Sequence, residues 1–539
     1  MAGDRFEIAS LDGALKVTRN GAVEFDSPWA GARLGKAMEW MEILNAGTLR
    51  GKPLHEAFRH GPYSLWQCWL HELYFPYFTS YAQFQGLFDW LESAGWPRLE
   101  IVSPLPGDLR KALTGAYLAG EGGAPGTLMA AAEAVARIGL PLAWRRSTLK
   151  RKNRVLIYTP DIVSDAVHGC DFRFSKVYAW LASRQVSGAE IFHLVDQRLA
   201  LRNARARGRI PMYLELWDTH PRMEKGMELQ ADGLPRSLQS LVRRILPRFA
   251  ANCNASARRI DGLKTMLRGS GLRLLLGMDD FRSNNELLIA CREEGIRTVL
   301  VQHGLITRFN PGWVACGLPE ETLIAPDRYL VRAPLWKSVL ERYAPRLAKV
   351  AVVAGGLDGV VQAEEGPKGL SAPRDPREGI DVLLVAETLW DPREAAPFIQ
   401  KLATDPRLRI HFKIRPDMDE RKQIRPYFGD GRPHRVVLDL AGARGEIDIV
   451  LGSHSSLIYK LLEWQKPIFR LETPFEYGEQ LDIFGLTDPL SLADEPYARF
   501  LGAMQRDGAV YAERWAAYRG ADDLPDYTTI LEAELMNAR

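Results

Sequence analysis

The 539-residue chain has few cysteines, and they form no recognisable motif. The five cysteines, with neither CxxC nor CxxxC spacing, are Cys68, Cys170, Cys253, Cys291 and Cys316. Isolated cysteines of this kind indicate neither a zinc site nor a disulfide framework. The chain also lacks any run of about 18 apolar residues, and no apolar segment follows the first five residues. We therefore expect no signal peptide, no transmembrane helix and a location in the reducing cytoplasm.

The motifs of several common enzyme classes are missing as well. The chain contains no GxGxxG, P-loop, GxSxG or HExxH, so nothing favours an oxidoreductase, NTPase, hydrolase or protease. Its one good DxD, Asp417-Met418-Asp419, directly follows Pro416. Acidic residues are common at helix starts, and this role explains the DxD without a metal ion. We expect neither an obligatory metal nor another cofactor.

Charge is small in total but uneven along the chain. The formal net charge is +3, which is too small to indicate nucleic-acid binding. Two segments contain basic residues and no acids: Arg145, Arg146, Lys150, Arg151, Lys152 and Arg154, then Arg198, Arg202, Arg205, Arg207 and Arg209. Such blocks attract phosphates of a lipid-linked acceptor, an anionic membrane or RNA. A solvated surface explains them equally well.

Residues 1–150 are expected to form a separate accessory module of mixed α and β structure. The opening alternates like short antiparallel strands over Phe6–Ala9, Ala14–Thr18 and Ala22–Phe25. A dense aromatic band follows: Trp40, Trp66, Trp69, Tyr74, Phe75, Tyr77, Phe78, Tyr81 and Phe84. Few basic residues interrupt this band, so we interpret it as a packed helical core and not as a surface that stacks bases.

The rest of the chain alternates buried strands with helices, which is typical of parallel α/β domains. The first series of expected strands is 154–158, 211–216, 272–277, 298–301, 328–331 and 350–353, and the second is 381–386, 409–413, 435–438, 447–451 and 467–471. A Gly- and Pro-rich stretch separates the two series. We predict Rossmann-like domains over 151–360 and 379–496, a linker over 361–378 and helices over 497–539.

Two strand ends carry the residues most suited to chemistry. Gln302-His303-Gly304 ends an expected strand of the first domain, and Ser453-His454-Ser455-Ser456 ends one of the second. Open α/β sheets bind ligands at the carboxyl ends of their strands. A cleft between two such domains favours group transfer from a phosphate-activated donor. Plain helix capping by the serines and a core role for His303 are the alternatives.

In these motifs the chain resembles the GT-B-fold transferases that build bacterial surface carbohydrates. The group comprises capsule and lipopolysaccharide transferases that use CMP-activated acidic sugars, and the related teichoic-acid glycerophosphotransferases. Gln302-His303-Gly304 looks like their QHG motif, 411–416 stands where they have a KxHP-type motif, and Ser453–Leu457 resembles their serine pair. The resemblance covers about residues 150–490 and implies two Rossmann-like domains facing across a cleft. The chain departs from the pattern at Arg415, because arginine holds a phosphate but cannot exchange protons.

A division of labour follows from these motifs. A departing nucleotide needs donors and positive charge already in place. We assign that task to Lys413, Arg415, Ser453, Ser455 and Ser456, with Glu387 as a further donor contact.

On the acceptor side, His303 is the catalytic candidate, on a loop with Gln302 and Gly304. A carboxylate near a first-domain strand end deprotonates a hydroxyl, and Asp171 is preferred over Asp161 and Asp279–Asp280. Helix capping is the competing interpretation for Asp171.

The resulting hypothesis is a cytoplasmic, metal-independent glycosyltransferase of the GT-B type. It moves a CMP-activated acidic sugar to a hydroxyl of a surface glycan, lipid-linked glycan or glycoprotein, without nucleic acid. Peripheral contact with the inner membrane through the basic segments is left open. The alternatives are a CDP-polyol or glycerol phosphotransferase, a nucleotide-sugar 2-epimerase and a non-catalytic scaffold.

Overall fold

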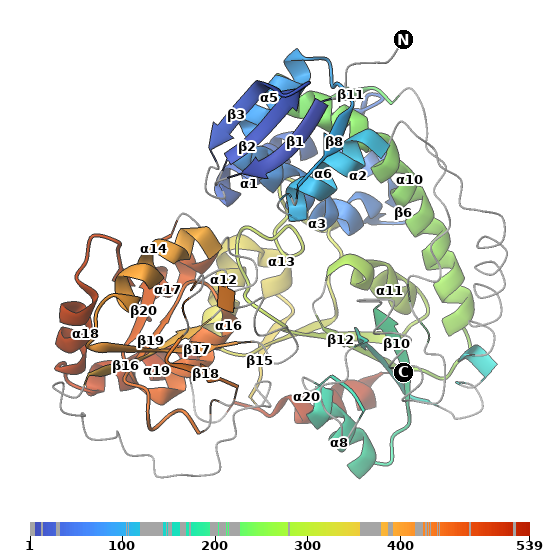
Figure 1. Cartoon of the computed structure of the whole chain (residues 1–539). Coiled ribbons are helices and arrows are strands. Elements are labelled where there is room, and N and C mark those ends of the chain that lie inside the picture. Colours follow the sequence, from blue (N-terminus) through green and yellow to red (C-terminus); the bar gives the residue numbers. More distant parts are fainter. Residues whose placement is uncertain are drawn as a thin grey trace.

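The chain is described by a computed structural model (Figure 1). It describes residues 6–11, 14–28, 33–103, 105, 107–118, 144–146, 148, 153–161, 169–171, 174–193, 203, 212, 214, 227–278, 281–355, 379–385, 392–414, 424–425, 428, 431, 433–438, 440, 442–473, 476–520 and 524–538. Of residues 11, 28, 107, 281–283, 392–394, 478 and 480 it describes the backbone. Within these residues no helix is long and apolar enough to cross a membrane.

The N-terminal module combines a small sheet with a helical core. Its sheet has the order β3-β2-β1-β8 (β1 Phe6–Leu11, β2 Ala14–Arg19, β3 Ala22–Pro28, β8 Leu99–Ile101), and β1–β3 form the antiparallel meander that the sequence predicts. The helices include α1 (Leu34–Asn45), α3 (Leu70–Leu73), α4 (Ser80–Gln83), α5 (Gln85–Ser93) and α6 (Gly107–Leu118), with the helical turns η1 (Leu65–Trp69) and η2 (Tyr74–Thr79). All members of the aromatic band except Phe75 are buried, and Phe75 packs against the same core, so the prediction of a packed interior is confirmed.

One long helix joins the module to the first domain. This helix is α10, Arg236–Leu267, which begins directly after Pro235. It packs against α5, α6 and η1 of the module and against α11 (Phe281–Glu293) of the first domain (Figure 1). The short strand β11 (Leu229–Gln230) pairs with β4 (Thr48–Leu49), which also pairs with β5 (Lys52–Pro53). Elements from both sides of residue 150 therefore share one core.

The first nucleotide-fold domain is built on a six-stranded parallel sheet of order β10-β9-β12-β13-β14-β15. Its strands are β9 (Val155–Pro160), β10 (Gly188–His193), β12 (Leu274–Met278), β13 (Arg297–Val301), β14 (Arg328–Val331) and β15 (Ala351–Val353). Every residue of β9 is buried, because alternate side chains enter cores on opposite faces of the sheet. One of these cores contains α8 (Ser175–Ser183) and α20 (Tyr527–Asn537).

The second nucleotide-fold domain is a six-stranded parallel sheet of order β18-β17-β16-β19-β20-β21. The strands are β16 (Ile380–Val385), β17 (Leu408–Lys413), β18 (Arg435–Val437), β19 (Ile449–Gly452), β20 (Ile468–Leu471) and β21 (Asp488–Leu490). Its described helices include α14 (Pro392–Ala403), α16 (Ser456–Leu461), α17 (Glu479–Ile483), α18 (Pro496–Met504) and α19 (Ala509–Arg519). The expectation of two Rossmann-like domains is confirmed by this pair of sheets.

The C-terminal helices divide between the two domains. Helix α19 contacts α12 (Pro334–Tyr343) of the first domain, where the Trp336 indole donates to the Tyr518 hydroxyl at 3.2 Å. Helix α20 then packs against α8 and β13, and Glu534 pairs with Arg297 and Arg328 at the start of β13 and β14 (Figure 1). The chain end thus completes the core of the first domain.

Parts of the sequence interpretation concern residues that the structure leaves out. Most of the strand expected over 211–216 and most of the two basic segments lie outside the described residues. Of those segments, Arg145 is placed beside the C-terminal end of α10, where its guanidinium donates to the Arg268 carbonyl at 3.3 Å.

Candidate functional site

Strand order marks one point at the carboxyl edge of each sheet where ligands bind in open α/β folds. In the first sheet, β10 lies on one side of β9 and the next strand, β12, lies on the other side. In the second sheet, β17 and β18 lie on one side of β16, and β19 lies on the other side. Loops diverge at such switch points and leave a crevice beside the strand ends. Asp161 directly follows β9, and Ser453 directly follows β19. Both positions were singled out from the sequence.

The loop after β13 is held by hydrogen bonds from its own side chain and from the neighbouring strand. The Gln302 side chain is buried, donates through Nε2 to the Gly304 carbonyl at 2.8 Å, and accepts through Oε1 from the Arg332 N–H at 2.9 Å. The Arg332 guanidinium donates to the carbonyls of Gln302 at 3.2 Å and His303 at 2.9 Å. These bonds fix the backbone on both sides of the half-buried His303.

Arg332 is a residue that the sequence interpretation missed. It directly follows β14, so its position at a strand end is the same signal that singled out Gln302. Gly304 shows why this loop suits a ligand, since a Cβ built there would meet no atom of the described residues within 4 Å. The loop therefore presents backbone to open space while its anchor lies behind it.

The loop after β19 is shaped by packing. Ser453 and His454 are buried, with His454 Nδ1 3.3 Å from Ser453 Oγ. Burial lowers the pKa of His454 to about 3, so its imidazole is neutral near pH 7. Ser455 and Ser456 are half-buried, and Ser455 caps α16 by accepting from the Leu457 N–H at 3.2 Å.

The remaining predicted donor contacts are only partly described. Lys413 ends β17 as predicted, but it is buried and its Nζ donates to the Ile414 carbonyl at 2.6 Å. Because β16 lies between β17 and β19, Lys413 and Ser453 are separated by two strand spacings, or about 10 Å. Arg415 and Glu387 lie outside the described residues, so their positions relative to these groups stay predictions.

The predicted carboxylates are buried within the first domain. Asp161 is 1% exposed and accepts from Asn203 Nδ2 at 3.2 Å, so part of its hydrogen-bonding capacity is already used. Asp171 is also 1% exposed, and its carbonyl accepts from the Phe174 N–H at 2.8 Å just before α8. The pair Asp279–Asp280 lies outside the described residues.

The segment around Tyr477 lies between the loop after β19 and the chain that follows Gln302–Gly304. Tyr477 lies in η8 (Glu476–Gly478), a turn that follows β20, and its ring packs edge-on against His454 with centroids 6.1 Å apart. Two residues further on, Glu479 accepts from the guanidinium of Arg308, on the segment that follows Gln302–Gly304, at 2.8 and 3.1 Å. Burial raises the pKa of Tyr477 well above its ordinary value, so the phenol stays protonated. The second-domain loop is thereby connected to the chain that follows the first-domain loop.

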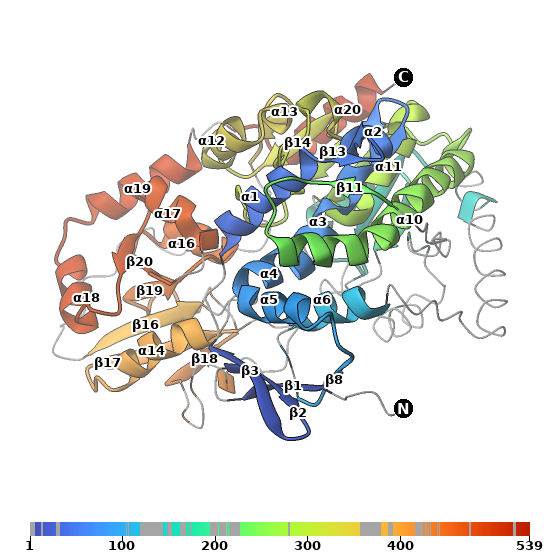
Figure 2. The same cartoon turned by 90° about the horizontal axis from the view of Figure 1, so that it is seen from above.

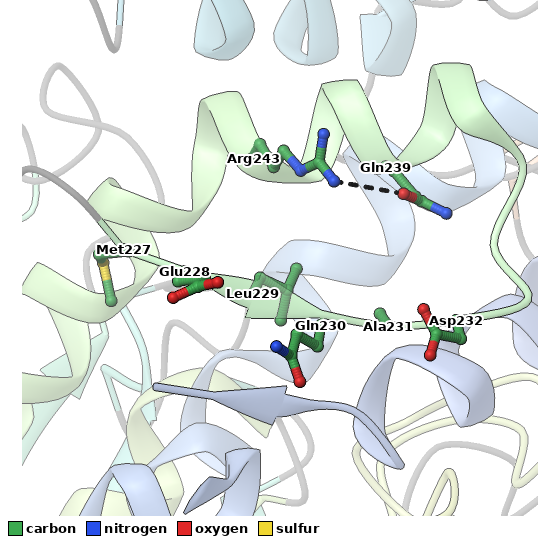
Figure 3. Close-up of a pocket in the computed structure, with 8 residues that line it drawn as sticks. All are labelled: Met227, Glu228, Leu229, Gln230, Ala231, Asp232, Gln239 and Arg243. Carbon is green, nitrogen blue, oxygen red and sulfur yellow. Dashed lines mark hydrogen bonds between the residues drawn. The ribbon is translucent and has the colours of Figure 1, made fainter. Parts of the chain in front are cut away.

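One cavity of the described residues lies away from both loops. A hollow of about 510 Å³ is formed between β11 and α10, where Met227–Asp232, Gln239 and Arg243 line it (Figure 3). A cavity of about 10 Å³ lies beside Gln302 and Arg332, with Tyr527 of α20 on its wall, and has room for about one water molecule. Among the described residues no group of three His, Cys, Asp or Glu side chains is arranged to hold a metal ion.

Comparison with known proteins finds similarity in architecture alone. No protein-family model matches the chain, and no curated protein matches it. Among solved structures, UDP-GlcNAc 2-epimerase from Neisseria meningitidis, bound to UDP-GlcNAc, aligns over 71% of this chain and 100% of its own at 10% identity, with a TM-score of 0.42. The calicheamicin glycosyltransferase CalG4 aligns over 71% and 99% at 13% identity, also with a TM-score of 0.42.

The spinosyn rhamnosyltransferase SpnG aligns over 70% of this chain and 99% of its own at 13% identity, with a TM-score of 0.39. At these levels of similarity the comparisons assign no activity. The two-domain architecture itself is established by the sheet topology of this chain.

Proposed function

We propose that the protein is a glycosyltransferase that moves a sugar from a nucleotide donor, a CMP-activated acidic sugar, to a hydroxyl of a bacterial surface glycan or glycoprotein. The observation that carries the proposal is that His303 follows β13 in one sheet and Ser455 and Ser456 follow β19 in the other, with the segment after β20 in contact with both His454 and Arg308. Both loops belong to carboxyl edges of parallel sheets, where such folds bind nucleotides.

The leaving nucleotide is assigned to the second domain. Its phosphate needs hydrogen-bond donors that are in place before the bond breaks. Ser455 and Ser456 are the half-buried hydroxyls at this edge, whereas Ser453 is buried and supports the loop from behind. Lys413 and Arg415 supply positive charge in this proposal, and Glu387 is a further donor contact. His454 is neutral near pH 7 and takes no part as an acid.

The attacking hydroxyl is assigned to the first domain. His303 is half-buried on a loop whose backbone is fixed by Arg332, which suits a group that must contact the attacking hydroxyl at a set position. A first-domain carboxylate, Asp171 or Asp161, orients or deprotonates the acceptor in this proposal. Asp161 stands at the switch point and Asp171 stands before α8, so both remain candidates.

The experiment that tests the proposal is a thermal-shift panel of CMP, CDP, UDP and GDP without added metal. A nucleotide at a hundred times its dissociation constant stabilises a protein by about 2.7 kcal/mol. We expect stabilisation by CMP. A response confined to CDP would redirect the proposal to a polyol phosphotransferase, and one confined to UDP to a UDP-sugar transferase or 2-epimerase. Silence across the panel would favour a scaffold.

Membrane contact is a separate part of the proposal. The acceptor is carried on a lipid or a protein, and the two basic segments approach the anionic surface at which a lipid-linked acceptor would lie. Sedimentation with vesicles of anionic and of neutral lipid tests this. Binding to neither would remove the membrane from the list of partners.

A further inference from the structure

Helix α1 of the N-terminal module begins against the second nucleotide-fold domain. The Gly35 N–H donates to Glu476 Oε2 at 2.8 Å, across 441 residues of sequence. The two groups meet closely, since a Cβ at Gly35 would lie 3.1 Å from Glu476 Oε1. Figure 2 shows α1 extending from the module towards α16 and α17. The first turn of α1 has no acidic residue and no side-chain cap of its own, so Glu476 takes that place.

A second carboxylate of the same segment reaches the first domain. Glu479, the first residue of α17, accepts two hydrogen bonds from the Arg308 guanidinium, at 2.8 and 3.1 Å. Arg308 also lies over the ring of Phe309, 4.5 Å from its centroid. This parallel pairing of guanidinium and carboxylate fixes orientation as well as distance.

Buried hydrogen bonds join the module to the segment that follows β13. Asn45 of α1 donates through Nδ2 to the Cys316 carbonyl at 2.7 Å and accepts from the Trp66 indole at 2.8 Å. Gln67 accepts through Oε1 from the Ile324 N–H at 2.6 Å. Because these groups are buried, breaking them would leave polar atoms without water. The segment 305–324 is therefore anchored to the module.

The ion pair between this segment and the second domain is more exposed than the hydrogen bonds to the module. Arg308 is 43% exposed and Glu479 is 21% exposed, so water can replace each partner when the two separate. We call Gly35, Arg308, Glu476, Tyr477 and Glu479 the cross-domain junction. It joins three parts of the chain: α1, the segment after Gln302–Gly304 and the segment after β20.

From this arrangement we infer that Glu476 and Glu479 are positioning residues, which hold the second domain against the N-terminal module and so set the spacing between the two strand-end loops. In this inference the module contributes to the geometry of the site between the two loops. The inference rests on the proposed function for its catalytic consequence, but the spacing itself is a property of the protein without ligand. Tyr477 stands between the two carboxylates and contacts His454, so a shift of this segment reaches the donor loop directly.

The test measures the distance between the domains. All five cysteines are buried, so spin labels can be placed on new cysteines at exposed Thr265 of α10 and Gln505 after α18. Distance distributions come from double electron–electron resonance without nucleotide. We expect a single narrow distribution in the parent protein. In Glu476→Ala/Glu479→Ala we expect it to broaden about twofold or shift to longer distances.

The matched control is Asp482→Ala on the same helix. Asp482 pairs with Arg470 inside the second domain, so its loss removes an ion pair without touching the junction. We expect the control to keep the parent distribution. If the double variant does not fold, Arg308→Met breaks the same contact from the first domain. A parent-like distribution in every folded junction variant would overturn the inference.

Catalysis supplies the second measurement. A displacement of about 1 Å between reacting groups can cost about a hundredfold in rate. We expect Glu476→Ala/Glu479→Ala to lower the rate of transfer from the CMP-sugar while its affinity for CMP changes by less than about threefold. Absence of CMP binding in the parent protein would refute the proposed donor and leave the distance result to decide the inference alone. Unchanged distances with normal CMP binding would refute the inference and leave the donor assignment standing.

Discussion

The two strand-end loops of the candidate site are held in different ways. Behind Gln302–Gly304, the Arg332 guanidinium and the Gln302 amide fix the backbone by hydrogen bonds, and the space in front of Gly304 is open. At the end of β19, a Cβ on Gly452 would lie 2.6 Å from Ile458 Cδ1, and Ser453 and His454 are buried. In the first loop, hydrogen bonds fix the backbone and leave the side chain of His303 available for chemistry. In the second loop, packed side chains hold the backbone that presents the hydroxyls of Ser455 and Ser456.

The largest effect that separates the two loops is expected at His303. If the first loop carries the chemistry, His303→Ala lowers the single-turnover transfer rate by about a hundred- to ten-thousand-fold, the usual size of a general-base or electrostatic contribution. CMP affinity stays nearly unchanged, because the donor belongs to the other loop. Rapid quench and calorimetric titration measure the two quantities. A loss of CMP binding in this variant would place His303 on the donor side.

The next largest effect is expected at Asp381, a buried acid in the central sheet of the second domain. Strand β9 contains no charged residue, but β16 carries buried Asp381, bound to Arg409 at 2.8 and 2.5 Å and to His411 at 2.8 Å. Burial raises the pKa of Asp381, but hydrogen bonds from Arg409 and His411 outweigh it and lower the pKa to about 2. Asp381→Asn should cost about 2–3 kcal/mol of unfolding free energy at pH 7, since it leaves a partly buried cation without its partner.

The sign of the pH dependence follows from that lowered pKa. An acid with a lower pKa in the folded state stabilises the fold above its ordinary pKa and loses that contribution as the pH falls through the folded value. The Asp381 contribution should therefore disappear between about pH 4 and pH 2. Urea melts of parent and variant should converge across that window. If the difference in unfolding free energy between parent and variant stays constant down to pH 2, the contribution of Asp381 does not depend on its ionisation.

A smaller effect should separate the two glycines. Gly452→Ala forces a methyl group against the buried Ile458 and should cost about 1–2 kcal/mol. Gly304→Ala should leave stability within about 0.5 kcal/mol, because its Cβ meets open space. If a ligand occupies that space, Gly304→Ala lowers the transfer rate in spite of its normal stability. Chemical denaturation and rate measurements on the pair test this, and equal stabilities would mean that Ile458 yields without strain.

The smallest effect is expected at Ser455. Ser455→Ala removes the cap of α16 and should cost about 1 kcal/mol. Ser455→Asp keeps a capping oxygen but adds negative charge, so it should retain stability and lose CMP affinity through repulsion of the phosphate. Thermal melts with and without CMP distinguish the cases. Unchanged CMP binding in Ser455→Asp would leave capping as the sole role of this serine.

Local patterns in the sequence were sufficient for the central elements of the fold. Runs of apolar residues predicted the strands ending at Val301 and Gly452, because a strand buried on both faces is apolar throughout. The aromatic band predicted a packed module because large aromatic side chains bury much apolar surface in a core. The edge strands β10 and β21 were missed, since Gly188–His193 contains a glutamate and Asp488–Leu490 contains a proline. Their pairing with a neighbouring strand, and not their own composition, makes them strands.

What the sequence by itself determined is which residues stand at strand ends, since strand and helix periodicities are local and repeat within a few residues. Only the tertiary structure decided what those residues contact. Arg332 anchors the His303 loop from the next strand, Lys413 is bonded to its own strand end, and Glu476 caps a helix 441 residues away. Contacts of this kind depend on how distant segments pack, and a single sequence carries no periodic signal for them.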